Sequence, residues 1–387
     1  MGWINTIKRR MFGNTPVYDG AGMGRRALKW NPGNPGAVSA LALTQDQLRT
    51  KSRDLVRRNA WAAAGIDAFV ANAIGTGIKP QSMIQDQPQR EAIHALWWSW
   101  CEDADAAGLT DFYGIQGLAT RAMLEGGESF VRMRYRRAED NLSVAFQLQV
   151  LEAEHLPISL NQDLPNGNVI RAGIEFDLLG RRVAYHLYRE HPNEVTMWFN
   201  PAETTRVPAG EVMHCYKPLT GTMQRGQPWM TPVMATLHDL ERYDAAELIR
   251  KKMSAMVVAF EVDVDPAGGP NVYGDQEGSD GVTEEGLEPG TYYRLPYGKD
   301  VRFNEPSDVG GMYPDFVRFQ LRKIAAGLGV TYEMLAGDLK EVSFSSIRAG
   351  TLEFRRRCEA FQHQVMVYQM CRPVWRAFIE AAVLSGQ

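Results

Sequence analysis

Three features of the sequence predict an α+β protein in which helices and sheet occupy separate stretches. Apolar residues recur at helical spacing between residues 44 and 124. From about residue 128 to 217 the pattern changes to the period-two alternation and β-rich composition of a mostly antiparallel sheet. Three further helical patterns follow after Pro232. A chain of 387 residues is too long for one ordinary core, so we expect two or three packed regions.

The chain begins with an irregular arm and continues into a basic helix. Residues 1–43 are dense in Gly, Pro and Asn, which predicts little regular structure. One helix is expected from Thr44, as its N-cap, to Ile74. The first half of this helix is basic, with Arg49, Lys51, Arg53, Arg57 and Arg58. We interpret these residues as a solvated helix face, in preference to a contact with an acidic neighbour or with DNA.

Two more helices and a sheet are expected next. The pattern from 90 to 108 places four apolar side chains on one helix face, and we interpret them as core: Ile93, Leu96, Trp97 and Trp100. A helix from Phe112 to Leu124 should stop at Gly126 and Gly127. Within the sheet region, residues 173–178 and 181–188 predict a hairpin around Gly180.

The loop between the sheet and the next helix imitates a nucleotide-binding loop. Gly221 and Gly226 have the Walker A interval, but Gln227 and Pro228 stand where Lys and Ser or Thr must hold phosphate and Mg²⁺. We therefore reject ATP binding here. Pro232 is tolerated at the first turn of the long helix that we expect over 233–260.

An acidic segment separates this long helix from the next. Between Glu261 and Glu288 there are nine acidic residues, six glycines and no Lys or Arg. We interpret its centre as a solvated loop kept extended by self-repulsion. Two short strands flanking Gly298 should follow, and then a helix from Asp315 to Leu328.

The last helix is expected from Ser345 to Val383, with Pro373 kinking or interrupting it within the preceding turn. Its apolar residues alternate at spacings of four and three and predict one buried stripe: Phe354, Cys358, Phe361, Val365 and Tyr368. Its opposite face is basic and carries Arg348, Arg355, Arg356 and Arg357.

Composition and motif content exclude several classes of function. The four cysteines are widely separated, so they indicate neither a disulfide scaffold nor a zinc ribbon. The seven histidines lack the spacing of a metal motif, and no catalytic nucleophile motif is present. No apolar run is long enough to span a bilayer, and the N-terminus lacks a signal core. A formal net charge of −4 argues against a surface that coats nucleic acid.

Several segments in the expected order resemble the portal proteins of tailed bacteriophages, specifically the lambda type. The resemblance is carried by YDGAGMGRR, RNAWAAAGIDAFVANAIGTGIKPQ, MLEGGESFVRMR, LQVLEAEHL, PSDVGGMYPDFVRFQLRKIAAGLGVTYEMLAGDL and SFSSIRAGTLEFRRR, followed by Pro373 and Trp375. These segments span nearly the whole chain.

The resemblance implies a portal fold and a ring, expected to be a dodecamer, at one capsid vertex, through which double-stranded DNA enters and leaves. It implies an N-terminal arm (1–43), a wing of helices and sheet (44–232), stem helices (233–260 and 305–336), a β clip (261–304), a tunnel loop (337–345) and a long wing helix (346–387). It implies no catalysis and no cofactor or metal. The expected partners are the terminase large subunit, the major capsid protein and a head-completion or adaptor protein, in a virion assembled in the host cytoplasm without membrane contact.

The same resemblance assigns roles to residues. The residues facing the DNA channel are expected to be Lys340, Glu341, Ser343, Ser345 and Ser346. Partner contacts are expected in the clip at Asp263, Asp265, Asp275, Glu277, Asp280, Glu284, Glu285, Tyr292 and Arg294. Arg348 and Arg355 to Arg357 are expected to pair with acids of a neighbouring subunit in preference to gripping DNA.

Two alternatives and two departures stay open at this point. The alternatives are a DNA-processing enzyme whose site is not evident in the sequence and a non-viral DNA-binding scaffold. The clip candidate is more acidic and Gly-rich than the family pattern. The chain also ends soon after its last helix, at Gln387, so a C-terminal crown is expected to be short, absent or not included.

Overall fold

The computed structural model describes residues 36–42, 44–194, 200, 203–256, 259–263, 299–303, 313–340 and 343–386. Before the sheets stand α2 (Ala37–Ala42), α3 (Gln45–Arg58), α4 (Ala60–Ala73), α5 (Gln87–Glu102) and α6 (Phe112–Gly126). After them come α7 (Met234–Met256), α8 (Tyr313–Leu328), α9 (Tyr332–Ala336), α10 (Phe344–Phe361), the π-helix η7 (Gln362–Cys371) and α11 (Arg372–Leu384). The predicted mixture of helices and sheet is therefore present.

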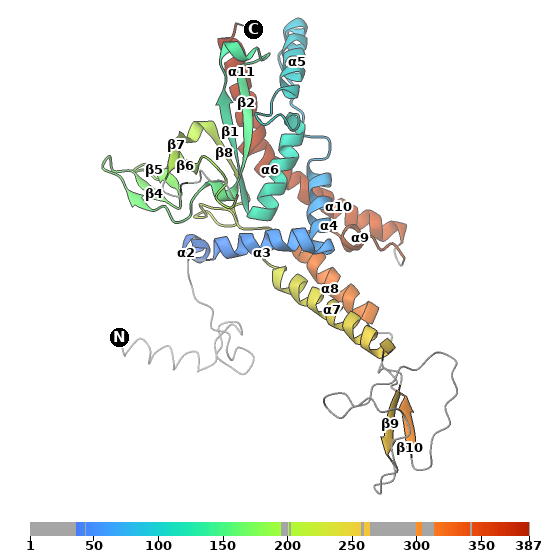
Figure 1. Ribbon diagram of the computed structural model, residues 1–387. Helices are drawn as coiled ribbons and strands as arrows, with labels where there is room; N and C mark the ends of the chain where they lie inside the picture. The colour runs from blue at the N-terminus through green and yellow to red at the C-terminus, as the bar shows by residue number, and fades with distance from the viewer. Residues whose placement is uncertain are drawn as a thin grey trace, which may run out of the picture.

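The helix expected from Thr44 to Ile74 is two helices, which corrects the prediction. Asn59 has an extended backbone, and its side-chain oxygen accepts hydrogen bonds from the amides of Trp61 (3.0 Å) and Ala62 (3.1 Å). Asn59 thus caps α4, whereas Thr44 stands at the predicted N-cap position of α3 without a side-chain capping bond. The chain turns sharply at this point, so that α3 and α4 run in different directions (Figure 1).

The sheet region forms two antiparallel sheets. The first has the order β2-β1-β8, with β1 over Glu128–Tyr135, β2 over Phe146–Glu152 and β8 over Val212–Tyr216. The second runs in sequence order through β3 (Gln162–Asp163), β4 (Val169–Arg171), β5 (Ile174–Phe176), β6 (Arg182–Tyr188) and β7 (Thr204–Pro208). The predicted hairpin is confirmed as β5 and β6, and its register shifts at Glu175 and Phe176.

One large core joins α3, α4, α6, α8 and the C-terminal helices to the first sheet. Trp97 and Trp100 of α5 belong to it and Leu96 packs against it, as predicted, whereas Ile93 does not. The Trp97 ring lies 5.0 Å from that of Trp375, and the Trp100 indole donates to the Phe146 carbonyl (2.7 Å). A second, smaller core lies between the two sheets and includes Phe130 of β1 and Tyr185 of β6.

Helices α7 and α8 form a hairpin that extends away from both cores (Figure 1). The helix expected to reach Phe260 ends at Met256, and a strand, β9 (Ala259–Asp263), pairs with β10 (Lys299–Phe303). At the base of the hairpin, a Cβ at Gly327 would lie 2.3 Å from a methyl carbon of Val233. The absence of a side chain at Gly327 therefore allows α8 to approach Val233, just before α7, closely.

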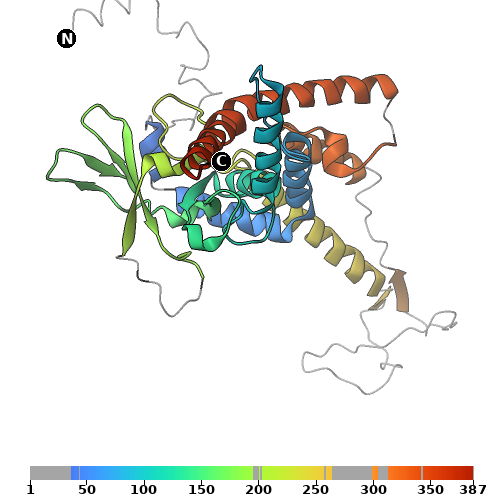
Figure 2. The same cartoon turned by 90° about the horizontal axis from the view of Figure 1, so that it is seen from above.

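The C-terminal helix is interrupted before Pro373, as predicted, but across ten residues of π-helix, and α10 and α11 diverge there (Figure 2). The buried stripe is confirmed at Phe354, Cys358, Phe361 and Val365. Its last member is wrong, because Tyr368 is 66% exposed. The wider turn of a π-helix shifts the following residues around the axis, so that Met366 and Met370 continue the stripe instead.

Candidate nucleic-acid and subunit interfaces

The loop between α9 and α10 carries the residues predicted to face DNA. Gly337, in the left-handed conformation, ends α9, and the Asp338 carboxylate then accepts hydrogen bonds from the Tyr332 hydroxyl (3.1 Å) and the Lys340 amide (3.2 Å). The Lys340 amide and the Tyr332 hydroxyl hold the pKa of Asp338 below its ordinary value. These bonds hold residues 337–340 in place while Lys340 stays exposed.

The serines of this region begin helix α10. The Ser343 hydroxyl accepts from the Ser346 amide (3.2 Å), and the Ser346 hydroxyl donates to the Ser343 carbonyl (2.9 Å). Both serines, and Ser345 between them, are exposed at the end of a projecting helix (Figure 1). Ser343 is therefore the N-cap of α10, a structural role that was not predicted from the sequence. Glu341 lies outside the described residues.

The arginines of α10 do not share one face. All four are exposed, and Arg356 pairs with Glu353 at 3.6 Å. Successive residues turn by about 100° around a helix, so Arg357 points some 200° away from Arg355. Arg357 instead lines a pocket beside Gly329 at the end of α8. The single basic face expected for these residues is corrected accordingly.

The predicted partner-binding segment is described only at its two ends. Asp263 stands opposite Lys299 in the β9–β10 ladder. The other residues assigned to this surface lie outside the described residues: Asp265, Asp275, Glu277, Asp280, Glu284, Glu285, Tyr292 and Arg294.

The basic stretch of α3 includes a buried ionic network, which the sequence reading missed. Arg49 is buried and pairs with the fully buried carboxylate of Glu128, which also pairs with Arg225 at 2.7 Å. The other oxygen of Glu128 accepts from His214 Nε2 and from the Gly226 amide, both at 2.9 Å. The interpretation of Arg49 as a solvated residue is therefore wrong, and contact with an acidic neighbour is right.

The electrostatics of this network are set by burial and by the two arginines. Burial alone would raise the pKa of Glu128, but Arg225, Arg49 and the bond from His214 hold it well below its ordinary value. Burial lowers the pKa of His214 to about 4, although Glu128 opposes that shift. His214 is consequently neutral at pH 7, donating through Nε2 to Glu128 while Nδ1 lies 3.3 Å from the Arg182 guanidinium. Glu128 and His214 are inaccessible to solvent, so the network holds the structure together and does not form an open reaction site.

Gly226, one of the two glycines at the Walker A interval, lies against the chain just before β1. A Cβ at Gly226 would lie 2.0 Å from the Gly127 carbonyl oxygen. Gly226 also accepts a hydrogen bond from the Gln45 side chain (2.8 Å). The loop over 221–226 thus packs against the start of β1 instead of surrounding phosphate. The sequence signal was the motif MLEGGESFVRMR, in which an acid directly follows two glycines at the start of an apolar strand.

One group of side chains has metal-ligand geometry. A carboxylate oxygen from each of Glu152 and Glu154 and a ring nitrogen of His191 lie within 4.8 Å of one another. Arg53 pairs with both carboxylates, at 2.8 Å for Glu154, and already supplies the cation. This also corrects the interpretation of Arg53 as solvated. Sequence spacing gave no indication of this cluster, because α3, the end of β2 with the residues just after it, and the residues that follow β6 meet only in the fold.

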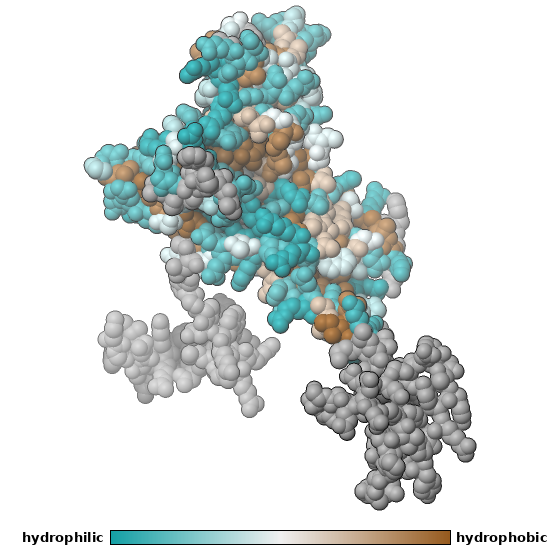
Figure 3. Space-filling view, in the orientation of Figure 1, coloured by the Kyte–Doolittle hydropathy of each residue, from teal (hydrophilic) through white to brown (hydrophobic). Residues whose placement is uncertain are grey.

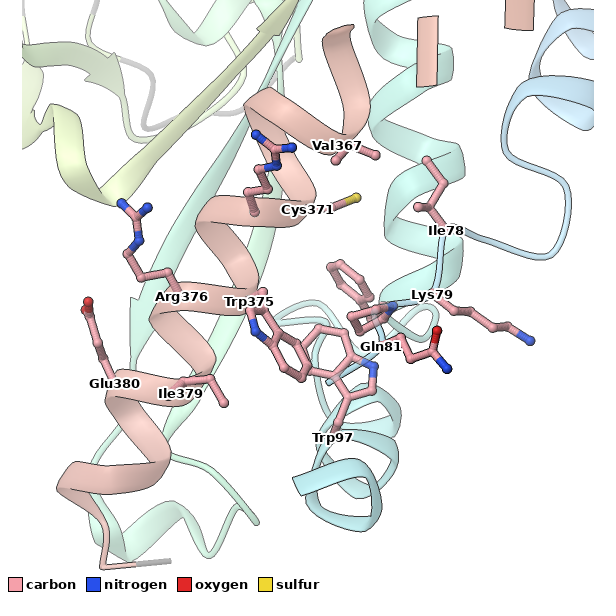
Figure 4. Close-up of a pocket in the computed structure, with 13 residues that line it drawn as sticks. Ile78, Lys79, Gln81, Trp97, Val367, Cys371, Trp375, Arg376, Ile379 and Glu380 are labelled. Atoms are coloured by element: carbon pink, nitrogen blue, oxygen red, sulfur yellow. The ribbon is translucent and has the colours of Figure 1, made fainter. Parts of the chain in front are cut away.

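A groove of about 710 Å³ lies between α11 and residues 78–81 (Figure 4). Trp375 is directed toward Trp97 in its floor, whereas Lys79 and Arg376 point away from that contact. Burial raises the pKa of Cys371, which lines the groove, to about 12. The thiol is therefore not a nucleophile at neutral pH. In the described part of the chain, no helix has the length and apolarity needed to cross a bilayer.

Comparison with known proteins gives consistent matches. The family model described as phage portal protein, lambda family, matches residues 23–362. A probable portal protein of Halomonas phage phiHAP-1 is 29% identical over 353 residues, which cover 88% of this chain and 67% of the relative. Portal protein B of Escherichia phage lambda is 25% identical over 377 residues, covering 86% and 68%.

Two solved structures have TM-scores just below 0.5. A chain in the virion of a native gene transfer agent particle aligns with a TM-score of 0.49 and 12% identity, covering 88% of this chain and 80% of that one. A chain in the neck of a native gene transfer agent particle, computed with C12 symmetry, aligns with a TM-score of 0.48 and 13% identity, covering 79% and 75%.

Proposed function

Because the chain belongs to the lambda family of phage portal proteins, we propose that its copies form the portal ring of a virion, through which double-stranded DNA is packaged and ejected. The observation that carries this proposal is the family match over residues 23–362 of a 387-residue chain. The ring is structural, and a separate packaging ATPase drives the DNA. Twelve copies are the expected number.

Within this ring, α7 and α8 serve as the stem and the β9–β10 ladder as the base of the clip. Contacts along the hairpin support a rigid stem: the Tyr243 ring lies 4.9 Å from that of Phe316, and the Tyr313 hydroxyl donates to Asp244 (2.9 Å). Residues 44–232 and the helices after Ser345 form the wing, and residues 337–345 form the tunnel loop.

The stem hairpin leaves large apolar side chains in solvent, as a ring component would. Leu248, Ile249 and Phe319 are 55%, 57% and 66% exposed, and Figure 3 shows apolar surface at the far end of the hairpin. Large apolar side chains left in solvent mark a candidate interaction surface. Neighbouring hairpins in a ring would cover these side chains.

A conduit must let a polyanion slide, so an acidic ring with few basic contacts suits the task. A chain of net charge −4 gives a twelve-membered ring about −48. Lys340 and the exposed serines 343, 345 and 346 are the groups that we assign to the channel wall. Arg348, Arg355 and Arg356 are assigned to the contact with a neighbouring subunit.

The acidic segment 261–304 is assigned to docking of the terminase large subunit and then of a head-completion protein, and the wing to contact with the major capsid protein. The support is the position of this segment between the two helices of the hairpin. Deleting residues 268–286 should abolish packaging while leaving ring formation intact. Unchanged packaging by the deletion variant would contradict the docking role.

Native mass spectrometry and electron microscopy of the purified protein test the proposed function directly. We expect closed rings with a central channel, and no ATPase or nuclease activity. A stable monomer with either activity would favour the DNA-processing alternative. Tight, salt-sensitive DNA binding by an isolated subunit would favour the scaffold alternative.

A further inference from the structure

A pocket of about 450 Å³ lies where the α7–α8 hairpin joins the rest of the protein. Its walls come from α4, the loop before α7, the end of α8 and the helix from α10 into η7, and they include Phe69, Trp229, Pro232, Phe361 and Val365. The Trp229 indole donates to the Leu328 carbonyl (2.6 Å) and packs 4.8 Å from the Phe69 ring. The floor is therefore apolar and fixed, and the volume is within the range of about 300–1,000 Å³ usual for ligand pockets.

Two cations from different elements reach this pocket. Lys217 follows β8, and its Nζ lies 4.3 Å from the centroid of the Trp229 ring. Arg357 comes from α10 and lies beside Gly329. The lining contains no Asp or Glu, and neither cation forms an ion pair with any residue that the structure describes.

In lacking a paired carboxylate among the described residues, Lys217 and Arg357 differ from other cations near the core. Arg49 and Arg53 are each matched by buried or half-buried carboxylates. Lys217 and Arg357 are themselves exposed, but the walls that partly cover Lys217, and then repulsion by Arg357, lower the pKa of its ammonium group. An anion placed between the two cations would relieve this repulsion.

The shape and chemistry of the pocket select the kind of anion. A phosphate of a duplex would match the two exposed cations but would leave the apolar floor uncovered. An acidic side chain flanked by apolar residues satisfies both the cations and the apolar floor. Arg357 of α10 is an exposed residue of the lining, and Leu219, also in the lining, is 58% exposed. A neighbouring copy that covered the Arg357 side of α10 would therefore also cover the pocket.

We propose that this pocket receives an acidic side chain and its apolar neighbours from the adjacent copy of the chain. The inference rests on the proposed ring and names one of its contacts. Lys217 and Arg357 bind the carboxylate, and Trp229 and Phe361 contact the apolar residues beside it. The Trp229 indole is hydrogen-bonded to the last residue of α8. The neighbouring copy would therefore contact this chain at the base of the α7–α8 hairpin.

Photo-crosslinking in assembled particles tests the occupant. A benzophenone amino acid replaces Leu219 at the rim, which is 58% exposed, and in a control it replaces Leu178, which is 82% exposed at the turn between β5 and β6. Assembly from mixed ¹⁴N and ¹⁵N chains distinguishes links within one copy from links between copies. We expect a link between copies from position 219, to a peptide that contains Asp or Glu, and none from position 178.

Each other result would overturn the proposal. Rings that form with links only within one chain, to DNA, or to no partner would exclude a neighbouring copy as occupant and leave the portal function standing. Protein that forms no ring would overturn both the proposed function and this contact. The mass of the assembly before irradiation therefore separates the two failures.

Charge reversal provides an independent measurement. The double variant Lys217→Glu, Arg357→Glu should raise the protein concentration at half-assembly by about tenfold or more, because it places like charges across a desolvated contact. The double variant Lys217→Arg, Arg357→Lys should assemble as the unchanged protein does. Arg181→Glu, at an exposed turn far along the sheet, is the matched control and should leave assembly unchanged. Equal assembly of the charge-reversed protein and this control would overturn the proposal even if the subunit folds normally.

Discussion

Replacing Glu128 by Gln should destabilise the subunit more than any change to an exposed ion pair. The Glu128 side chain is fully buried and forms ion pairs with both Arg49 and Arg225. Its Oε2 atom accepts from His214 and Gly226, both at 2.9 Å. An amide nitrogen in that position would face two donors, and each buried donor left unsatisfied costs about 1–3 kcal/mol.

The expected loss for Glu128→Gln is about 3–5 kcal/mol of unfolding free energy, the usual cost of removing one partner from a buried ion pair. Urea unfolding followed by tryptophan fluorescence measures it. The matched control is Asp177→Asn, which breaks the Asp177–Arg181 pair at the exposed turn and should cost less than about 1 kcal/mol. Equal losses in the two variants would refute the assignment of Glu128 as the charge that holds α3, β1 and the 221–226 loop together.

The same network predicts how stability depends on pH. The pKa of His214 falls from 6.5 to about 4 on folding, so stability present above pH 6.5 is lost as the pH falls toward 4. The pKa of Glu128 is also depressed, so a further loss sets in below about pH 4.5. Glu128→Gln should flatten this acid limb. An unchanged slope below pH 4.5 in the variant would contradict the role of Glu128.

Three further outcomes are expected. Gly327→Ala should cost about 1–3 kcal/mol by overpacking against Val233, whereas Gly350→Ala, with only ordinary contacts, should be neutral or slightly stabilising; thermal unfolding of both variants checks this. Phe319→Gln should weaken ring assembly without lowering subunit stability, as native mass spectrometry and unfolding of the same sample would show, since its ring is mostly exposed. Lys340→Ala keeps the helix cap intact and should reduce the fraction of particles that retain DNA; normal packaging and retention would count against a channel role.

Local sequence patterns predicted most of the helices and strands of this fold. The errors occurred where one residue or a short irregular stretch ended or altered a helix. The apolar periodicity placed α5, α6, α8 and the buried stripe of α10, because each buries a face that repeats with the helix. Asn59 broke the first helix because its side chain caps the second half, and an Asn within a helical pattern gives no strong warning of that. Tyr368 was misplaced because a π-helical stretch has no composition that distinguishes it from an α-helix.

The candidate interfaces were predictable to different degrees. Exposure of the loop around Lys340 followed from its polar, Gly-bearing sequence. The pairing of Arg49 with Glu128, and the meeting of Lys217 with Arg357, joins residues 79 and 140 positions apart in the chain. No local rule connects residues so distant, and only a shared core brings them together.

Amphipathic periodicity and turn residues, which act over a few residues, predicted the α+β class. The sequence segments that resemble lambda-type portal proteins identified the family. The tertiary packing alone determined which charges are buried and paired, and which two are left facing an apolar pocket. The physical reason is that the electrostatic energy of a charged group depends on the groups that folding places around it. Those groups come from distant parts of the sequence.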